Sequence, residues 1–466
     1  MTSLQRVAEK LRAALQTVVT QVPVAFAAAA ITACTSSVPP PAVVTEAPYS
    51  PDSGSLAIVC GRLIDGMSRE ARAVTTVVVR EGRIESVRPG ERTPRDLPHL
   101  DLREYTCLPG LIDMHTHVTE TSEDTADMSV YLRRTPEEQA ALSSKHARET
   151  LLAGFTTIRN VGNYQAWTDR DLRDAINRGE VVGPRMQIVG FYLTIPRGGG
   201  DLIVPGVADE DIPSHFRAGT ARTPEEFRLK AQAAVEGGAD LLKVIASGAV
   251  LAHGGVPGEP EVLPESLAAI VEVANASGLK VAAHAHGALS IRQAILAGAS
   301  TIEHASLIDD EGIRLAGERG VALAMDVWNG DYIDTEGRKQ GWPEEFLRKN
   351  FETTEAQRQS FTRAHAAGVP IVYATDAGVY PHGLNAKQFV IMVQRGMTPM
   401  EAIQSATSVA ARYLGWDDRV GAFAPGRFGD LIAVKGDPLE DITRLQDVAV
   451  VVKGGLVFKT PVRSGT

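Results

Sequence analysis

The middle of this chain alternates between short apolar runs, which predict buried strands, and longer amphipathic stretches, which predict helices. Helical stretches include 136–152, 224–236, 264–276 and 290–297, several of them opening on Thr-Pro or Leu-Pro. The predicted strands are Leu108–His117, Gly154–Val161, Met186–Leu193, Asp240–Ser247, Lys280–His286, Ser300–Ala305, Val321–Val327 and Pro370–Asp376. Eight such units predict an α/β fold, a (β/α)8 TIM barrel over residues 108–420.

Two blocks that contain only strand signals flank this middle part. Residues 55–107 hold three β-branched runs, and the last two are separated by Arg80-Glu81-Gly82, which is typical of a tight turn. Residues 421–462 repeat the pattern, with apolar runs at 430–434, 448–452 and 456–458. We therefore expect a small composite β-sandwich domain that is built from both ends of the chain.

The N-terminal residues are set aside from the fold. Arg6, Lys10 and Arg12 precede an apolar run at 22–31 that is too short to span a bilayer. Residues 1–34 thus predict a signal peptide, and Ile31-Thr32-Ala33-Cys34 resembles a bacterial lipoprotein box with Cys34 as the lipid anchor. Ordinary secretion and an unprocessed N-terminus stay open as alternatives. Residues 35–54, rich in Pro, Ser and Ala, predict a flexible tether. The predicted location is periplasmic or membrane-anchored.

Composition narrows the classes of partner. The chain has 466 residues and a net charge of −10, with the acidic excess spread along it and no basic run. Nucleic acid is therefore not an expected partner. Cys34, Cys60 and Cys107 have no metal-ligand spacing and cannot all pair with one another, so we expect no disulfide framework.

Unusual polar residues fall at the predicted carboxyl ends of the barrel strands, where active residues of this fold lie. His115 and His117 are two apart, so in a strand both side chains point to the same side. The other candidate metal ligands, each from its own strand, are Lys243, His284, His304 and Asp376. Imidazole and oxygen ligands suit zinc or a similar divalent ion.

A lysine among apolar neighbours needs an explanation, because a buried charge without a partner is costly. Lys243 could pair with a carboxylate. Alternatively, its amine could react with CO2 and form a carbamate, an anionic group that bridges two metals. The residues alone leave both roles open.

Taken in order, these motifs resemble the amidohydrolase superfamily. The resemblance is to its prolidase-like branch, which includes imidazolonepropionase-related peptidases and ochratoxin-hydrolysing amidohydrolases. It runs from about Ala57 to Phe458 and is strongest in 108–117, 154–162, 238–248, 284–287 with 301–304, and 374–383. Residues 421–430 and 436–439 also match the way in which such chains re-enter their small β domain.

The resemblance implies a binuclear metal centre and a set of roles. His115, His117 and Asp376 would bind the more buried metal, His284 and His304 the second, and Lys243 would bridge them as a carbamate. Asp376 would also act as general base towards a hydroxide held between the two metals. His286 lies on the same side of its strand as His284, and we assign it to contact with the substrate or with a metal ligand. That His286 is the ligand in place of His284 stays open as an alternative.

The chain departs from the family pattern in two places, which bears on the residues expected to bind the substrate. Asn160 stands where many relatives have Asp, and Pro196-Arg197-Gly198-Gly199-Gly200-Asp201 stands where many have Gly-Gly-His-Gly-Asp. Arg197 could therefore meet a substrate carboxylate. Loop 248–262 is expected to overhang the metals, and 328–342 to act as a lid. The remaining candidates for substrate binding are His253, Tyr192, Tyr380 and His382.

Together these features predict a metal-dependent hydrolase that cleaves an amide bond next to a free carboxylate. A dipeptide, an N-acyl amino acid or an ochratoxin-A-like amide would fit as the small-molecule substrate. A cyclic amidase or deaminase of the same superfamily is one alternative, and a surface lipoprotein with a non-catalytic binding barrel is another. Assembly into a homo-oligomer is also possible for this fold.

Overall fold

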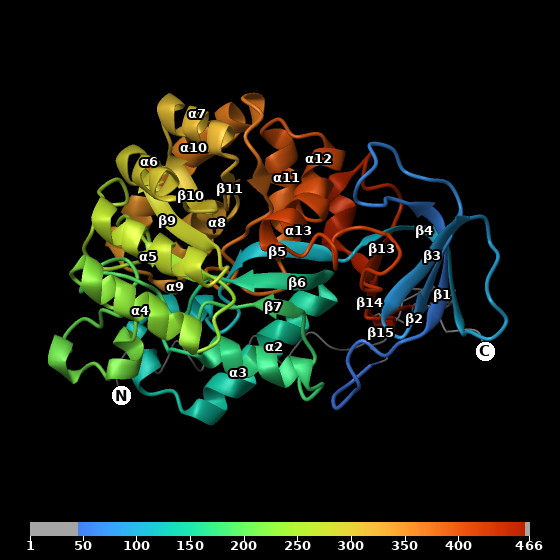
Figure 1. Cartoon of the computed structure of the whole chain (residues 1–466), viewed down its shortest axis with the longest axis horizontal. Coiled ribbons are helices and arrows are strands. Elements are labelled where there is room, and N and C mark those ends of the chain that lie inside the picture. The colour runs from blue at the N-terminus through green and yellow to red at the C-terminus, as the bar shows by residue number, and fades with distance from the viewer. Residues whose placement is uncertain (1–44, 462–466) are drawn as a thin grey trace, which may run out of the picture. The chain divides into compact units, whose positions relative to one another are not determined.

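The computed structural model describes residues 45–461 of the chain (Figure 1). The expected signal peptide and Cys34 lie outside the described residues. Within residues 45–461, no helix combines the length and the hydrophobicity needed to span a bilayer.

The barrel predicted from the alternating pattern is present, although several strands are shorter than expected. Its strands are β5 (Leu111–Thr116), β6 (Phe155–Asn160), β7 (Arg185–Gln187), β8 (Leu242–Ile245), β9 (Val281–Gly287), β10 (Thr301–Leu307), β11 (Ala322–Ala324) and β12 (Ile371–Val372). All neighbouring strands pair in parallel, as β5-β6-β7 and β8-β9-β10-β11-β12. Backbone bonds from Met114 to Tyr373 and from Leu193 to Lys243, both 2.8 Å long, join these two groups and close the barrel.

Helices follow the strands and cover the barrel. They are α2 (Pro136–Leu152), α3 (Thr168–Asn177), α4 (Pro224–Glu236), α5 (Pro264–Ala276), α6 (Ala288–Ala297), α7 (Asp310–Arg319), α8 (Asn329–Tyr332), α9 (Arg338–Gln340), α10 (Glu344–Ala366), α11 (Gln388–Gln394), α12 (Pro399–Ser405) and α13 (Ser408–Leu414). The Thr-Pro starts explain the good agreement for α2 and α4. At α2, Thr135 accepts a bond from the Glu138 N–H and Glu138 accepts one from the Thr135 N–H, which satisfies two otherwise free donors.

Strands from both ends of the chain form one seven-stranded sheet (Figure 1). Its order is β15-β14-β13-β4-β1-β2-β3, with bounds β15 (Leu456–Lys459), β14 (Val448–Lys453), β13 (Leu431–Lys435), β4 (His99–Pro109), β1 (Leu56–Leu63), β2 (Thr75–Arg80) and β3 (Arg83–Pro89). Glu81 and Gly82 have φ of 46° and 75°, as a tight hairpin turn requires. The sequence pattern missed β4, because we placed one strand at 108–117 where the chain has β4, a break at Gly110 and then β5.

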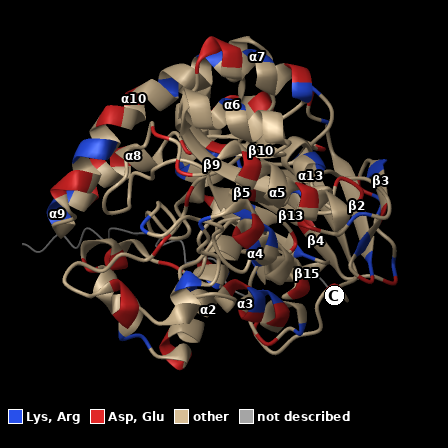
Figure 2. Cartoon of the chain, turned by 60° about the vertical axis from the view of Figure 1, so that its left-hand side comes forward, with Lys and Arg blue, Asp and Glu red and all other residues tan. Residues whose placement is uncertain are grey.

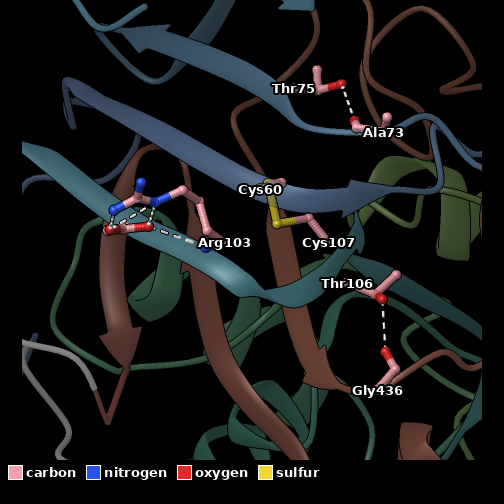
Figure 3. Close-up of a disulfide and its surroundings, with 8 residues drawn as sticks. Cys60, Ala73, Thr75, Arg103, Thr106, Cys107 and Gly436 are labelled. Carbon is pink, nitrogen blue, oxygen red and sulfur yellow. Dashed lines mark hydrogen bonds and ion pairs between the residues drawn. A yellow bond between two sulfur atoms is a disulfide. The ribbon is translucent and has the colours of Figure 1, made fainter. Parts of the chain in front are cut away.

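The expectation about cysteines was wrong, because Cys60 on β1 and Cys107 on β4 form a disulfide (Figure 3). The two residues are 47 positions apart, and the β2–β3 hairpin lies between them in sequence. Parallel pairing of β1 with β4 brings their Cα atoms to 5.9 Å, a normal disulfide separation. Sequence spacing carries no sign of this contact.

Removing the disulfide is expected to destabilise the composite sheet. Without the crosslink the unfolded chain regains the entropy of a loop of this length, which is worth about 4 kcal/mol in the chain-entropy model. A Cys60→Ala/Cys107→Ala variant should therefore melt at a lower temperature than the wild-type protein with its disulfide. Dithiothreitol should lower the melting temperature of the wild type and leave that of the variant unchanged. Equal melting temperatures for the variant and the wild type without dithiothreitol would contradict this expectation.

The predicted tether also differs in the structure. From Thr45 onwards the segment packs against the folded chain: the Tyr49 N–H donates to the Gly179 carbonyl at 3.0 Å, and the Tyr49 ring contacts Phe458 edge to face. Asp52 pairs with the buried guanidinium of Arg185 at 2.6 Å. Residues 45–54 are therefore not a flexible tether, although their composition is rich in Pro and Ser.

Charged residues of both signs are interspersed on the outer helices, as α10 and α7 illustrate (Figure 2). Arg314 on α7, for example, pairs with Glu311 and Glu318 one turn to either side. Exposed pairs of this kind contribute little to stability individually.

Candidate metal centre

The two histidines at the end of β5 meet Asp376, which follows β12 across the barrel closure. The Nε2 atoms of His115 and His117 lie 3.3 Å and 3.1 Å from the same Asp376 oxygen. All three side chains line one cavity at the carboxyl ends of the strands. Their ligand atoms are close enough to hold one metal ion.

Each of these rings is held through its other nitrogen. His115 Nδ1 lies 2.7 Å from Glu303, and His117 Nδ1 lies 2.9 Å from the Gly162 carbonyl and 3.0 Å from the Tyr192 hydroxyl. With Nδ1 donating to these oxygens, Nε2 keeps its lone pair and points to the shared site. Such partners fix the tautomer that a metal requires.

A second group of potential ligands comes from β9 and β10. His284, His286 and His304 converge, and His304 also converges with Asp326 and Asp376. His304 Nδ1 is 2.9 Å from Asp326, which leaves its Nε2 free for a metal. The three rings contact one another, with His286 stacked on His304 at 4.8 Å between centroids.

His284 and His286 differ in which nitrogen is engaged. His284 Nε2 faces the Gly248 carbonyl at 3.4 Å, so its Nδ1 is the free nitrogen. His286 Nδ1 lies 2.8 Å from the Ser306 hydroxyl, so its Nε2 is free. Both residues line the cavity, and the geometry leaves either able to bind a metal.

The backbone at two candidate ligands is strained. His304 and Asp376 have φ of 68° and 61°, values that non-glycine residues rarely adopt. Such strain concentrates at functional sites, where surrounding contacts hold it in place. For Asp376 the holding contact is its N–H, which donates to the His115 carbonyl at 2.8 Å. Burial raises the pKa of Asp376, but the adjacent His115 and His117 outweigh this effect and hold the pKa well below its usual range.

Lys243 lies in β8 with 2% of its surface exposed, and it lines the same cavity. Burial lowers its pKa to about 8, although the charge of Glu303 opposes this shift. No side chain of residues 45–461 forms a hydrogen bond or an ion pair with its Nζ. Lys243 therefore does not pair with a carboxylate, which was the first of the two roles that the sequence left open. The lowered pKa leaves more of the amine neutral than in an exposed lysine, and only the neutral amine reacts with CO2.

Arg159 on β6 and Glu303 on β10 form a buried ion pair behind His115, which the sequence analysis did not assign. Their side chains approach to 2.7 Å, and Arg159 also donates to Thr301 at 3.0 Å. Burial raises the pKa of Glu303, but Arg159 and His115 hold it well below its usual range. Glu303 therefore stays ionised and can orient His115.

Asp326, after β11, plays the corresponding part for His304. Its carboxylate also accepts bonds from Gln357 on α10, at 2.7 Å, and from Asn329. The Asn329 amide lies 3.2 Å from the second oxygen of Asp376, so it connects the two carboxylates. Asp326 is the residue before the end of the predicted strand 321–327, and the rule used for the other ligands could have identified it.

Of the six residues predicted to bind substrate, His286 and Tyr192 line the cavity and the other four do not. Arg197 is exposed and pairs with Asp209 at 2.9 Å. His253 packs on Phe346 beside α10. The two remaining candidates are enclosed behind the cavity wall, Tyr380 against Trp328 and His382 against His146. Burial lowers the pKa of His382 to about 3, so this ring is neutral.

Both predicted loops contribute to the wall. Ala249, Val250 and Leu251 line the cavity from the loop after β8, and Asn329 and Ile333 line it from the segment after β11. The buried Lys349 on α10 donates to the carbonyls of Ala252, at 2.8 Å, and Gly254. This lysine holds the first loop against the helix.

We expect Glu303→Gln to weaken metal binding by about 10- to 100-fold, the usual cost of removing a group that orients a ligand. The neutral amide cannot stabilise the His115 tautomer as a carboxylate does, and it leaves Arg159 without its counter-charge. Competition between the protein and a zinc chelator measures the effect. Glu311→Gln, an exposed change on the following helix, is the matched control. Equal zinc affinity in the two variants would show that Glu303 does not orient the ligand.

Comparisons with known proteins identify the family and several relatives of this chain. Residues 106–457 match the family model described as "Amidohydrolase family". Ochratoxinase from Aspergillus niger is 31% identical over 375 residues, which cover 77% of each chain. A solved Xaa-Pro dipeptidase with bound methionine in its active site is 35% identical, with a TM-score of 0.80 over 87% of this chain and 100% of that one. A prolidase complexed with N-methylphosphonate-L-proline is 28% identical, with a TM-score of 0.81 over 87% and 100%.

Proposed function

This chain belongs to the amidohydrolase family, and from that premise we propose that it hydrolyses an amide or peptide bond in a small substrate, next to a free carboxylate. One observation carries the proposal: Lys243, His115, His117, His284, His304 and Asp376, which come from five barrel strands and their ends, all line one cavity. The ochratoxinase and prolidase relatives support the same class of bond.

The donor set fits two divalent ions, with zinc suited to its nitrogen and oxygen ligands. His115, His117 and Asp376 would hold one ion and His284 and His304 the other, with carboxylated Lys243 between them. Bound divalent ions supply Lewis acidity, which polarises the amide carbonyl and makes water more acidic. The free nitrogens on His115, His117 and His304 support this assignment, because each ring's other nitrogen is already engaged.

The chain's own groups provide proton transfer and positioning. Asp376, held ionised by the two histidines, takes the proton of the attacking water and returns it to the leaving nitrogen. The Asn329 amide restrains its second oxygen. Tyr192 keeps His117 in place through its hydroxyl.

The substrate carboxylate meets neutral donors in this proposal. Arg197 is turned away to Asp209, and burial lowers the pKa of His286 to about 3. His286 therefore contributes a hydrogen bond without a full charge. Tyr192 is the second donor that faces the cavity.

The decisive experiment pairs metal analysis with a substrate panel. Protein grown with zinc should carry about two equivalents of metal per chain. It should cleave dipeptides, N-acyl amino acids or an ochratoxin-like amide, and lose that activity after chelation. Cleavage of cyclic amides alone would favour the cyclic amidase reading. Metal-free protein that leaves every amide intact would support a binding barrel instead.

We also propose that the protein works outside the cytoplasm. The Cys60–Cys107 disulfide supports this location, because disulfides persist in oxidising compartments. Fractionation of the source cells, with the mature N-terminus determined by mass spectrometry, tests the proposal. A full-length chain in the cytosolic fraction with reduced thiols would overturn it.

A further inference from the structure

Glu120 is an acidic side chain in the cavity that the proposed chemistry does not use. It lies three residues after His117, and its backbone N–H donates to the His117 carbonyl at 2.9 Å. One carboxylate oxygen accepts the Tyr164 N–H at 2.8 Å. Within residues 45–461, no Lys or Arg forms an ion pair with this carboxylate. Arg134, which lies nearby, is paired with Asp124 at 2.7 Å.

Three tyrosine rings share this part of the cavity with Glu120. Tyr131, Tyr164 and Tyr192 all line the cavity. Tyr164 contacts the other two edge to face, with centroid separations of 5.1 Å to Tyr131 and 5.7 Å to Tyr192. Aromatic faces attract cations through their quadrupole, and the attraction is larger where water is excluded.

The charged residues that line the cavity also favour a cation beside Glu120. Among the described residues that line it, the only Lys or Arg is Lys243, which belongs to the metal centre. The cavity therefore offers one carboxyl group without an ion-pair partner next to electron-rich rings. Burial raises the pKa of this group to about 7, and a bound cation would favour its ionised form. An anionic substituent placed there would meet repulsion, whereas a cation would gain both a charge partner and ring contacts.

We propose that Glu120, Tyr131 and Tyr164 form a subsite for a protonated amine or guanidinium of the substrate. The proposal rests on the amide-hydrolase function and selects among its substrates. It favours dipeptides that carry a cation, either the α-ammonium or a basic side chain, over neutral N-acyl amino acids and ochratoxin-like amides.

Two matched pairs of substrates distinguish the sources of the cation. Leu-Phe against N-acetyl-Leu-Phe tests the α-ammonium, and N-acetyl-Lys-Phe against N-acetyl-norleucyl-Phe tests the side chain. In zinc-loaded wild-type protein, kcat/KM should favour the cationic member of at least one pair by about 30-fold, as a charged hydrogen bond in a buried site gives. Glu120→Gln should reduce that ratio to near one.

The ratio within each variant is the readout, because changes in folding or metal content affect both members of a pair alike. Glu123→Gln is the matched control, since Glu123 is exposed and lies three residues further along. Tyr164→Leu should reduce the ratio by a few-fold, as loss of one ring contact predicts, and Tyr164→Phe should preserve it. A wild-type ratio near one in both pairs, or a ratio unchanged by Glu120→Gln, would overturn the subsite.

A binding measurement separates this inference from the proposed function. Calorimetric titration compares leucinamide with N-acetyl-leucinamide, which lacks the ammonium group. Tighter binding of leucinamide that disappears in Glu120→Gln supports the subsite even where no amide of the panel is cleaved. Cleavage of amides with equal binding of the two probes in wild type, together with a ratio near one for the N-acetyl-Lys-Phe pair, leaves the hydrolase intact and removes the subsite.

Discussion

Lys243→Ala is expected to lose metal and activity together. In the proposed arrangement this side chain supplies the anionic group shared by both ions, and without it their mutual repulsion at short range is no longer screened. Metal content measured by plasma emission should fall sharply, and kcat/KM on the best amide should fall by at least about 10³-fold. Propionate in the assay should restore part of the activity by standing in for the missing carboxylate.

The control is Lys280→Ala, a lysine-to-alanine change at the opposite end of the barrel. Lys280 Nζ donates to the Tyr413 carbonyl at 2.6 Å and has no contact with the centre. This variant should keep both metal and turnover. If Lys243→Ala instead retains its metal and near-normal turnover, the lysine is a structural residue and the bridged centre has no basis.

Asp376→Asn should separate metal binding from catalysis. The amide can still offer an oxygen, and the other ligands remain, so much of the metal should stay bound. Turnover should fall by about 10²- to 10⁴-fold, because the amide cannot carry the proton from water to the leaving nitrogen. Metal analysis and kcat measured on the same preparation test both halves of the expectation. A variant that keeps its metal and most of its turnover would assign the proton transfer to another group.

The order of barrel elements could be predicted from the sequence because each one has its own local signal. The Thr-Pro starts fixed α2 and α4, and the apolar runs located all eight strands. Strand lengths could not be predicted in the same way. β7, β11 and β12 have only two or three residues in regular pairing, and the apolar residues after them, such as Tyr373 and Ala374, are buried in irregular backbone. Apolar residues in a sequence indicate which segments are buried. They do not indicate which backbone groups form the hydrogen bonds of a regular strand.

The residues of the candidate site also differ in how far the sequence predicts their roles. Histidines at strand ends are unusual enough to be noticed, and they do converge. Glu303 and Asp326 were harder to interpret because a carboxylate in a sequence gives no indication of its partner, which here lies on another strand. Arg197 shows the opposite error: an arginine in a plausible loop has a nearer carboxylate in Asp209. Glu120 became informative only when its surroundings were known to lack a free cation.

The position of β4 in the composite sheet has a consequence for how the chain is made. β4 lies between β1, which precedes it closely, and β13, which is synthesised more than three hundred residues later. At about 5–20 residues per second, one edge of β4 waits tens of seconds for its neighbour on the ribosome. Where the chain enters an oxidising compartment as it is made, the Cys60–Cys107 crosslink can secure the other edge during that interval. A nascent chain cut short before β13 thus carries an open strand edge, the kind of surface that recruits other chains and that chaperones must cover.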